Sequence, residues 1–268
     1  MPPIITLLTD FGTADGYVAA VKGVLISRAP RATIVDITHE IPAHDIEAGR
    51  ISLERYWLWY PPETVHLCVV DPGVGSDRAA LAVQSEGRFL VGPDNGLLSP
   101  ALLVAGARAV TLGVPANVSP TFHARDVFAP VAARLAYGAK LEVLGEPADP
   151  LVIMTPEPRR DQKGVFIGEI IAFDRFGNAI TNLPVRPTTV EVGGRVLPVA
   201  LTYADLDPGE AGAVVGSSGT IEIVVREGRA ANLLDLKKGT VVRATSRRPR
   251  RPSPAWRWTP GAWPRRLR

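Results

Sequence analysis

Short apolar segments alternate with helix-like segments through the first half of this chain, and that alternation limits the fold more than any other feature. The apolar segments lie at residues 4–8, 33–37 and 65–70. Between the first two, Val18, Val21 and Leu25 recur at the spacing of one helix face. The third segment is apolar on both faces, as is typical of a buried parallel strand. The alternation therefore predicts an α/β domain with a largely parallel sheet.

Capping and turn residues predict further elements in this half. Asp45 is suited to cap a helix, and two prolines follow its expected end near residue 60. Asp126 is suited to be the N-cap of a second helix, which Gly138 would terminate. The predicted elements are a helix from 45 to about 60, a hairpin of 79–84 and 88–91 through Glu86 and Gly87, and a helix over 126–137.

The pattern changes after a polar, proline-containing break at residues 155–164, which we interpret as a linker. Beyond it the chain has short strand-like runs, and Gly193 and Gly194 between two of them indicate a hairpin. We therefore expect a second, smaller, all-β domain. The predicted organisation is an α/β domain at 1–154, a linker at 155–164, a β domain at 165–246 and a tail at 247–268.

The positive charge of the chain is concentrated in the 247–268 tail. The net charge is +3, but the tail has eight arginines and no acid, so the other 246 residues carry −5. The basic pI therefore does not indicate a nucleic-acid function for the folded part. Five prolines and three tryptophans accompany the arginines, and we expect a disordered tail, with contact to nucleic acid or another anionic surface as the alternative.

Composition and length exclude several classes of protein. The chain has 268 residues, which is enough to bury a large core without disulfides or metals. Cys68 is the only cysteine, so neither an intramolecular disulfide nor a Cys/His zinc cluster is expected. No apolar run reaches the ~18–20 residues of a membrane span, and the N-terminus lacks a basic region before its apolar run. We therefore expect a cytoplasmic protein.

Polar clusters follow the predicted strands, where open α/β sheets bind ligands. Asp10 comes directly after the first strand and can accept two hydrogen bonds from a ribose diol; a cap or turn role is the alternative. Asp71 follows the buried strand, and Arg78 lies across a glycine-containing turn from it, where the two can form a charge pair. The letters Asp-Phe-Gly at 10–12 come too early for a kinase, and no Walker sequence is present.

Three other places offer candidate site residues. His123 precedes the predicted helix at 126 and is either a catalytic residue or a packed histidine. In the second domain, Asp174, Phe176 and Asn178 suit charge pairing, stacking on a base and recognition of a base edge. A turn with asparagine in a left-handed conformation is the alternative there. Ser217 lies in a Gly-Ser-Ser-Gly segment that can donate to a carboxylate or form a plain turn.

Taken in order, these segments resemble the S-adenosyl-L-methionine hydroxide adenosyltransferases, which are relatives of the fluorinase and chlorinase enzymes. The resemblance extends from residue 9 to about residue 240. The strings are TDFGTADGYV at 9–18, DITHEIPAHD at 36–45, VVDPGVGSDR at 69–78, GPDNGLLS at 92–99, FHARDVFAP at 122–130, FDRFGNAITN at 173–182 and GSSG at 216–219. One such string alone would be weak, whereas seven in order are specific.

The resemblance implies an N-terminal α/β domain and a C-terminal barrel-like β domain. It also implies a homotrimer whose active sites lie between the N-domain of one subunit and the C-domain of the next. The implied reaction is attack of water on C5′ of S-adenosyl-L-methionine, which gives adenosine and L-methionine. No cofactor or metal is implied, and neither a membrane nor a nucleic-acid partner is expected, apart from a weak contribution of the tail.

The family's site residues map onto matching positions of this chain. Its Asp–Arg–His triad falls on Asp71, Arg78 and His123. Either Asp71 or His123 can accept the proton of the attacking water, and Arg78 can stabilise the developing hydroxide. The substrate contacts fall on Asp10 for the ribose, on Asp15, Asp174 and Ser217 for the methionine part, and on Phe176 and Asn178 for the adenine.

One position departs from the family. Ala124 stands where the family usually has glycine, and its methyl group lies next to His123 in the sequence, where it can crowd the water site. This departure keeps open a second function, a non-catalytic protein that binds S-adenosylmethionine or adenosine. A nucleophilic halogenase is a third hypothesis, which the Asp–Arg–His set disfavours because the halogenases lack that set.

Overall fold

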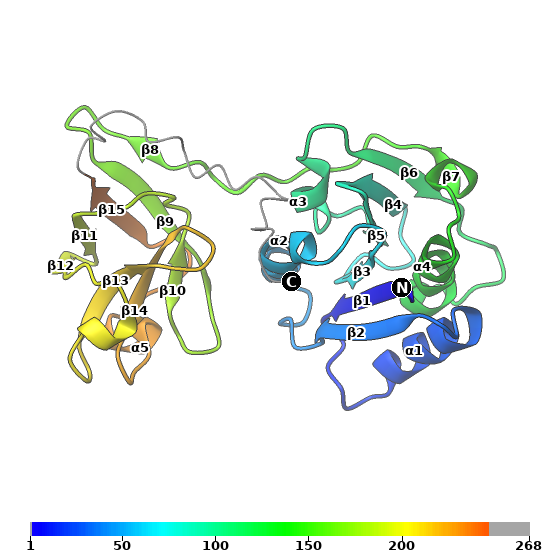
Figure 1. The fold of residues 1–268 in the computed structure, drawn as a ribbon, viewed down its shortest axis with the longest axis horizontal. Helices are drawn as coiled ribbons and strands as arrows, with labels where there is room; N and C mark the ends of the chain where they lie inside the picture. Colours follow the sequence, from blue (N-terminus) through cyan, green and yellow to red (C-terminus); the bar gives the residue numbers. More distant parts are fainter. Residues whose placement is uncertain (1, 247–268) are drawn as a thin grey trace, which may run out of the picture. The chain divides into compact units, whose positions relative to one another are not determined.

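The computed structural model describes residues 2–246 and divides into two compact units, Met1–Met154 and Thr155–Arg268 (Figure 1). The expected disorder of the tail falls on 247–268, which lie outside the described residues. Within the described part, no helix is long and apolar enough to cross a membrane.

The first unit is built on a mixed sheet with strand order β2-β1-β3-β5-β4-β6-β7. The pairs within β2-β1-β3-β5 are parallel, whereas β4 pairs antiparallel with β5 and β6, and β6 with β7. The strands are β1 (Ile4–Thr9), β2 (Thr33–Thr38), β3 (Val65–Val69), β4 (Ala80–Ser85), β5 (Arg88–Pro93), β6 (Arg108–Leu112) and β7 (Gly145–Pro147).

The prediction of a largely parallel sheet is therefore right for only half of this sheet. The predicted hairpin is present, and Glu86 and Gly87 at its turn both have positive φ, at 48° and 70°. A two-residue turn can join only antiparallel strands, so β4 and β5 have opposite directions. Because β6 then pairs with β4 rather than extending the parallel series, the second half of the sheet is antiparallel.

Helices cover both faces of this sheet (Figure 1). One apolar core includes Val21 and Leu25 of α1 with Ala132 of α4, and the other includes Leu53 of α2 with the buried Trp57. The helical elements are α1 (Tyr17–Arg28), α2 (Ile46–Tyr56), α3 (Ser99–Leu102) and α4 (Ala129–Ala136), with 3₁₀ turns at Trp57–Trp59 and Leu141–Val143 and a π-helical turn at Ala124–Phe128. The result is a three-layer α/β/α unit.

The caps of two helices test the sequence predictions directly. Asp45 caps α2 as expected, accepting a hydrogen bond from Ala48 N at 2.9 Å, although α2 ends at Tyr56 and a 3₁₀ turn continues the segment. The assignment of Asp126 as an N-cap is wrong. A π-helical turn begins at Ala124 and leads into α4, so Asp126 lies inside the helical segment and accepts from Ser119 N at 3.0 Å.

The second unit is a nearly closed, antiparallel, barrel-like sheet with order β12-β11-β15-β9-β10-β14-β13. Beyond β12 the chain returns to β13 through a bridge between Val199 and Ala213, which brings the two ends of the order together. The elements are β8 (Arg159–Arg160), which pairs with β9, β9 (Phe166–Phe173), β10 (Ala179–Thr181), β11 (Thr189–Val192), β12 (Arg195–Leu197), β13 (Ala211–Val215), β14 (Ile221–Val225), β15 (Val241–Thr245), α5 (Ala230–Leu233) and a 3₁₀ turn at Tyr203–Asp205.

Candidate active site

The order in which strands are added to the sheet of the first unit reverses at β1, and this places two candidate carboxylates at one edge of the sheet. From β1 the chain passes through α1 to β2 on one side, and then through α2 to β3 on the other side. Thr9 at the end of β1 is in register with Val69 at the end of β3. Asp10 and Asp71 therefore leave the sheet at the same edge, at the kind of switch point where α/β sheets bind ligands.

Arg78 pairs with Asp71 through both of its carboxylate oxygens. Arg78 Nε donates to Asp71 Oδ1 at 2.8 Å, and Nη2 donates to Oδ2. The side chains are only 5% exposed for Asp71 and 10% for Arg78, and the guanidinium also donates to the carbonyl of Ala79 and lies over the ring of Phe128. A two-pronged pair of this kind fixes both groups in one orientation. The charge pair expected from the sequence is present.

His123 joins this pair from the start of the helical segment that leads into α4. Its Nδ1 lies 3.2 Å from Arg78 Nη2. A guanidinium can only donate, so Nδ1 is the acceptor and the proton of the neutral ring is on Nε2. Burial of the ring and the charge of Arg78 lower the pKa of His123, while Asp71 and Asp126 oppose that shift. His123 is thus held neutral near pH 7, with a donor on its second nitrogen.

A glycine lets the loop after β3 reach the loop before His123. Gly75 has φ of +78°, and a Cβ atom there would lie 2.5 Å from the carbonyl oxygen of Pro120. Any other residue would therefore push these two loops apart. Within the same unit, Asn95 ties the end of β5 to that of β3, because its Nδ2 donates to Val70 O at 2.8 Å.

Asp10 lies in a turn that is held by the segment after β2. Its Oδ2 accepts a hydrogen bond from His44 N at 2.8 Å, and Gly16 rather than Asp10 is the N-cap of α1. Asp15 is exposed just before α1. Beside them Phe11, Tyr17 and Phe122 form an edge-to-face cluster with ring centroids 5.2–6.3 Å apart, in the same unit as His123.

In the second unit, Asp174 and Asn178 hold each other. Asp174 Oδ1 accepts from Asn178 N at 2.8 Å, and Oδ2 accepts from Asn178 Nδ2 at 2.9 Å. The left-handed residue of this turn is Gly177, not Asn178, and a Cβ there would lie 2.7 Å from Arg229 Cβ. Phe176, which lies between Asp174 and Asn178 in this turn, is 73% exposed, whereas Asn178 is 5% exposed.

Ser217 is exposed in the turn between β13 and β14, and a buried carboxylate lies beneath that turn. A Cβ on the preceding Gly216 would meet Glu222 Oε1 at 1.9 Å, and Tyr203 donates to Glu222 Oε2 at 3.3 Å. Burial, Glu222 and then Asp174 raise the pKa of Tyr203. The turns that carry Asp174 and Ser217 thus both lie near Tyr203, a residue without any sequence signal.

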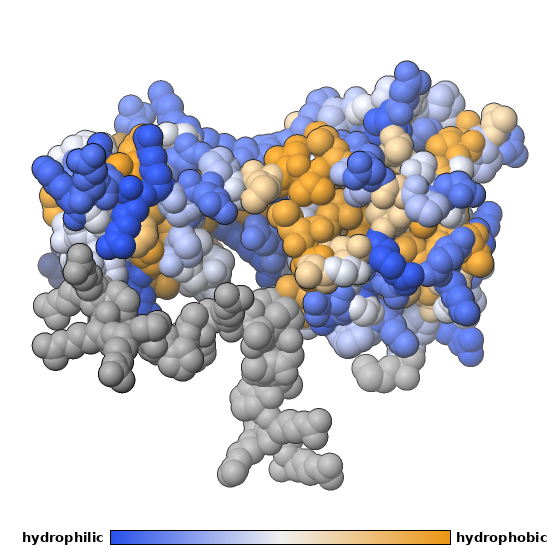
Figure 2. All heavy atoms as spheres, turned by 90° about the horizontal axis from the view of Figure 1, so that it is seen from above, coloured by the Kyte–Doolittle hydropathy of each residue, from blue (hydrophilic) through white to orange (hydrophobic). Residues whose placement is uncertain are grey.

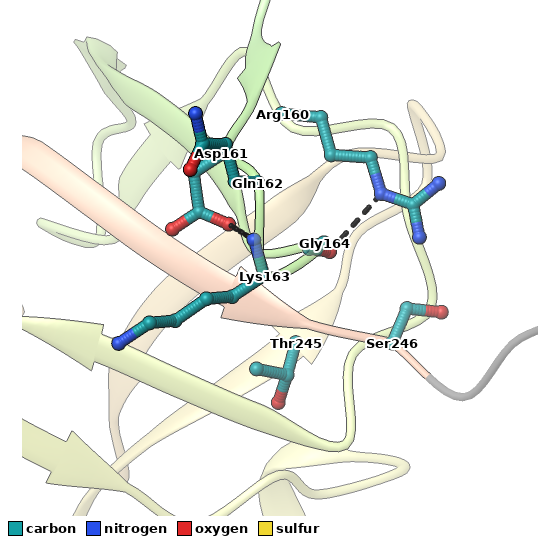
Figure 3. Close-up of a pocket in the computed structure, with 7 residues that line it drawn as sticks. All are labelled: Arg160, Asp161, Gln162, Lys163, Gly164, Thr245 and Ser246. Atoms are coloured by element: carbon teal, nitrogen blue, oxygen red, sulfur yellow. Dashed lines mark hydrogen bonds between the residues drawn. The ribbon is translucent and has the colours of Figure 1, made fainter.

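Two surface pockets, one in each unit, are lined by other residues. One of about 410 Å³ in the second unit is lined by Arg160, Asp161, Gln162, Lys163, Gly164, Thr245 and Ser246 (Figure 3). Another of about 560 Å³ in the first unit is lined by residues 111–113 and 142–146. Among the described residues, no group of three His, Cys, Asp or Glu side chains is arranged to hold a metal.

Ala124 is oriented differently from what its sequence position suggests. It is 3% exposed and belongs to the apolar core shared by α1 and α4. Its methyl group therefore packs among core side chains, and the expected crowding of the site next to His123 is not indicated.

Together these observations define a class: a two-unit protein with a mixed α/β unit, a barrel-like β unit and an Asp–Arg–His cluster at a sheet switch point. The chain belongs to the S-adenosyl-L-methionine hydroxide adenosyltransferase family. The family model of the N-terminal domain matches residues 5–145, and that of the C-terminal domain matches residues 168–243.

Individual relatives are similar over nearly their whole length. A protein of Salinispora arenicola named (R)-S-adenosyl-L-methionine hydrolase is 42% identical over 91% of this chain and 98% of its own. A protein of the same name from Thermus thermophilus is also 42% identical, over 89% and 98%. The solved structure of an uncharacterized conserved protein from Thermotoga maritima superposes with a TM-score of 0.81, at 35% identity, and covers 90% of this chain and all of the other.

Proposed function

We propose that this protein hydrolyses S-adenosyl-L-methionine to adenosine and L-methionine by attack of water on C5′. The observation that carries the proposal is that one guanidinium, that of Arg78, is bonded to Asp71 and to His123 at the switch point of the sheet. Membership of the hydroxide adenosyltransferase family and the names of two relatives support the same reaction.

The chemistry needs an oriented, activated water more than an acid, because the sulfonium is already a good leaving group. Asp71 keeps acceptor capacity beyond its two bonds to Arg78, so we assign it the proton of the attacking water. Neutral His123 presents Nε2–H and can hold the water oxygen. The positive charge of Arg78 stabilises the hydroxide that develops in the transition state. No cofactor is needed for this displacement, in which the C5′–O bond forms as the C5′–S bond breaks.

We further propose that the remaining predicted residues bind the substrate. Asp10 can accept from the two ribose hydroxyls through the carboxylate that His44 N orients. The exposed Phe176 offers a ring face to the adenine, and the acids offer charge to the methionine ammonium. The full set is Asp10 for ribose, Asp15, Asp174 and Ser217 for methionine, and Phe176 and Asn178 for adenine.

The resemblance also leads us to propose a homotrimer, with the N-terminal unit of one subunit and the C-terminal unit of the next contributing to each site. Exposed apolar side chains support burial against another copy. In the view of Figure 2 they gather on the first unit, whose exposed large hydrophobics include Leu103 and residues 151–154. Sedimentation equilibrium should give three times the 28.7 kDa chain mass. A monomer would refute the assembly. The cytoplasmic location expected from the sequence stays a prediction.

The reaction is tested by incubating the purified protein with S-adenosylmethionine and separating the products by liquid chromatography. Both sulfonium epimers are supplied, with and without chloride and a chelator. Equal amounts of adenosine and methionine are expected, independent of chloride and chelator. Asp71→Asn should abolish turnover. Asp77→Asn is the matched control, because Asp77 is an exposed acid in the same loop, and it should react like the wild type.

Other outcomes would indicate either a different function or a different base. Bound S-adenosylmethionine or adenosine without any product would indicate a non-catalytic binding protein. A 5′-halo-adenosine that forms only with halide would indicate a halogenase. Full activity of Asp71→Asn would refute the assigned base while leaving the reaction in place.

A further inference from the structure

A chain of polar contacts runs from the surface of α1 to the turn that carries Asp10. Lys22 Nζ donates to Asp36 Oδ2 at 2.6 Å, and Asp36 Oδ1 lies 3.1 Å from His39 Nε2. His39 Nδ1 is in turn 2.8 Å from the hydroxyl of Thr9. Lys22 and Asp36 are partly exposed, whereas His39 is 6% and Thr9 3% exposed. This series of contacts therefore leads from solvent into the interior and ends at Thr9, one residue before Asp10.

The contacts along this chain have one consistent direction. His39 Nε2 lies 3.1 Å from a carboxylate oxygen of Asp36, whose charge favours the proton on that nitrogen, so Nδ1 accepts a hydrogen bond from the Thr9 hydroxyl. The Thr9 oxygen then remains free to accept from Phe11 N, which lies 3.3 Å away. Burial opposes ionisation of Asp36, but the hydrogen bond from Lys22 and the nearby His39 ring hold its pKa below the usual value.

The backbone of His39 holds the other side of the same turn. Its carbonyl oxygen accepts a hydrogen bond from Gly12 N at 2.8 Å. The side chain of His39 thus contacts Thr9, the residue before Asp10, and its carbonyl group binds Gly12, two residues after Asp10. Because the Asp10 carboxylate bonds to His44 N, the turn and the segment after β2 fit together through three separate contacts.

We propose that His39 is a positioning residue of the candidate site, which fixes the turn at residues 9–12 and thereby the direction of the Asp10 carboxylate. The proposal rests on the assignment of Asp10 to the ribose under the proposed function and adds a residue to it. His39 touches no substrate in this role. It acts through Thr9 and Gly12, so loss of its contacts should weaken nucleoside binding rather than remove a reacting group.

A purely structural role would also destabilise the protein, so the test needs a matched buried bond. Strand β1 supplies one, because the hydroxyl of Thr6 contacts His66 Nδ1 at the same distance of 2.8 Å, with both side chains fully buried. Thr6→Val and Thr9→Val each remove one buried Thr–His hydrogen bond from the same strand. Only the second of these bonds adjoins the Asp10 turn. Because Thr9→Val also removes the contact from Phe11 N, His39→Leu, which keeps that contact, is measured beside them and should weaken adenosine binding to a similar extent.

Adenosine affinity is measured by calorimetry for both valine variants and for Thr9→Ser, together with KM and kcat for S-adenosylmethionine. Losing one such bond corresponds to about a five- to tenfold weakening. Thr9→Val should weaken adenosine binding and raise KM by that factor, Thr9→Ser should restore both, and Thr6→Val should stay within about twofold of the wild type. Similar unfolding midpoints for the two valine variants would show that stability does not account for the difference.

The outcomes separate the inference from the function on which it rests. Wild-type adenosine affinity in Thr9→Val, or equal weakening in both valine variants, would overturn the positioning role while hydrolysis by the wild type continued. If the wild type binds adenosine without hydrolysing S-adenosylmethionine, the proposed function fails, and the two valine variants still decide the role of His39. A wild type that neither binds adenosine nor hydrolyses S-adenosylmethionine would overturn both.

Discussion

Replacing Arg78 with methionine should destabilise the first unit and should do so through Asp71. Methionine keeps an apolar stem near the ring of Phe128, over which the guanidinium lies at 5.3 Å. The change removes both hydrogen bonds to Asp71 together with those to His123 and the Ala79 carbonyl. The Asp71 carboxylate, only 5% exposed, then remains buried without its counter-charge.

Removing one partner of a buried ion pair costs about 3–5 kcal/mol, most of it from the charge that is left behind. With a urea m-value of about 2 kcal/mol/M, the unfolding midpoint of Arg78→Met should fall by about 1.5–2.5 M. Replacing both partners removes the stranded charge. The double variant Asp71→Asn with Arg78→Met should therefore be more stable than Arg78→Met alone, by about 1–3 kcal/mol.

Tryptophan fluorescence can follow this transition in the first unit. Trp57, which is 1% exposed, and Trp59 lie in this unit, and residues 155–246 contain no tryptophan. The three tryptophans of the 247–268 segment are first changed to phenylalanine, so that the signal comes from the first unit. A loss below about 1 kcal/mol in Arg78→Met, or a double variant less stable than it, would refute the reasoning that a stranded charge dominates.

Three further outcomes follow from the same site. The acid limb of kcat/KM should report a pKa below 6.5, because burial and Arg78 lower the pKa of His123. Protonation of His123 would place a proton against the guanidinium of Arg78. A limb above 6.5 in a pH–rate profile would contradict this. Ala124→Gly should lower the free energy of unfolding by about 1–2 kcal/mol in urea titrations while kcat stays unchanged, since the methyl group is buried in the core. Gly75→Ala should cost about 1–3 kcal/mol and reduce kcat, because its Cβ would lie 2.5 Å from the Pro120 carbonyl; wild-type activity and stability would show that the loops tolerate it.

Local sequence signals predicted most elements of the first unit correctly. The Asp45 cap, the hairpin turn at Glu86 and Gly87 and the terminating Gly138 depend on a few residues whose chemistry is specific, and all three are present. What the sequence did not predict depends on contacts between distant segments. The antiparallel half of the sheet follows from the pairing of β6 with β4, and no local pattern in the apolar stretch around residue 110 distinguishes that partner from a parallel one.

In the candidate site, too, contacts between residues close in sequence could be predicted, whereas contacts between distant segments could not. The charge pair of Asp71 and Arg78 was predictable because only six residues, with glycines at 73 and 75, separate them, a spacing that a single turn can close. The contact of His123 with Arg78 spans 45 residues and could be expected only from the family resemblance. Tyr203 and Glu222 beneath the Ser217 turn had no signal, since neither belongs to a recognisable motif.

Exposure separates the residues proposed for reaction from some of those proposed for recognition. Asp71, Arg78 and His123 are 5%, 10% and 6% exposed and are joined to one another, so their geometry is set before any ligand arrives. Such preorganisation matters most for groups that stabilise charge in a transition state, because they need not reorganise during the reaction. Phe176, by contrast, is 73% exposed on a turn whose backbone Asp174 and Gly177 fix. An exposed aromatic ring on such a turn can bury apolar surface when a base or another copy of the chain covers it, and its contribution to binding would come from that burial.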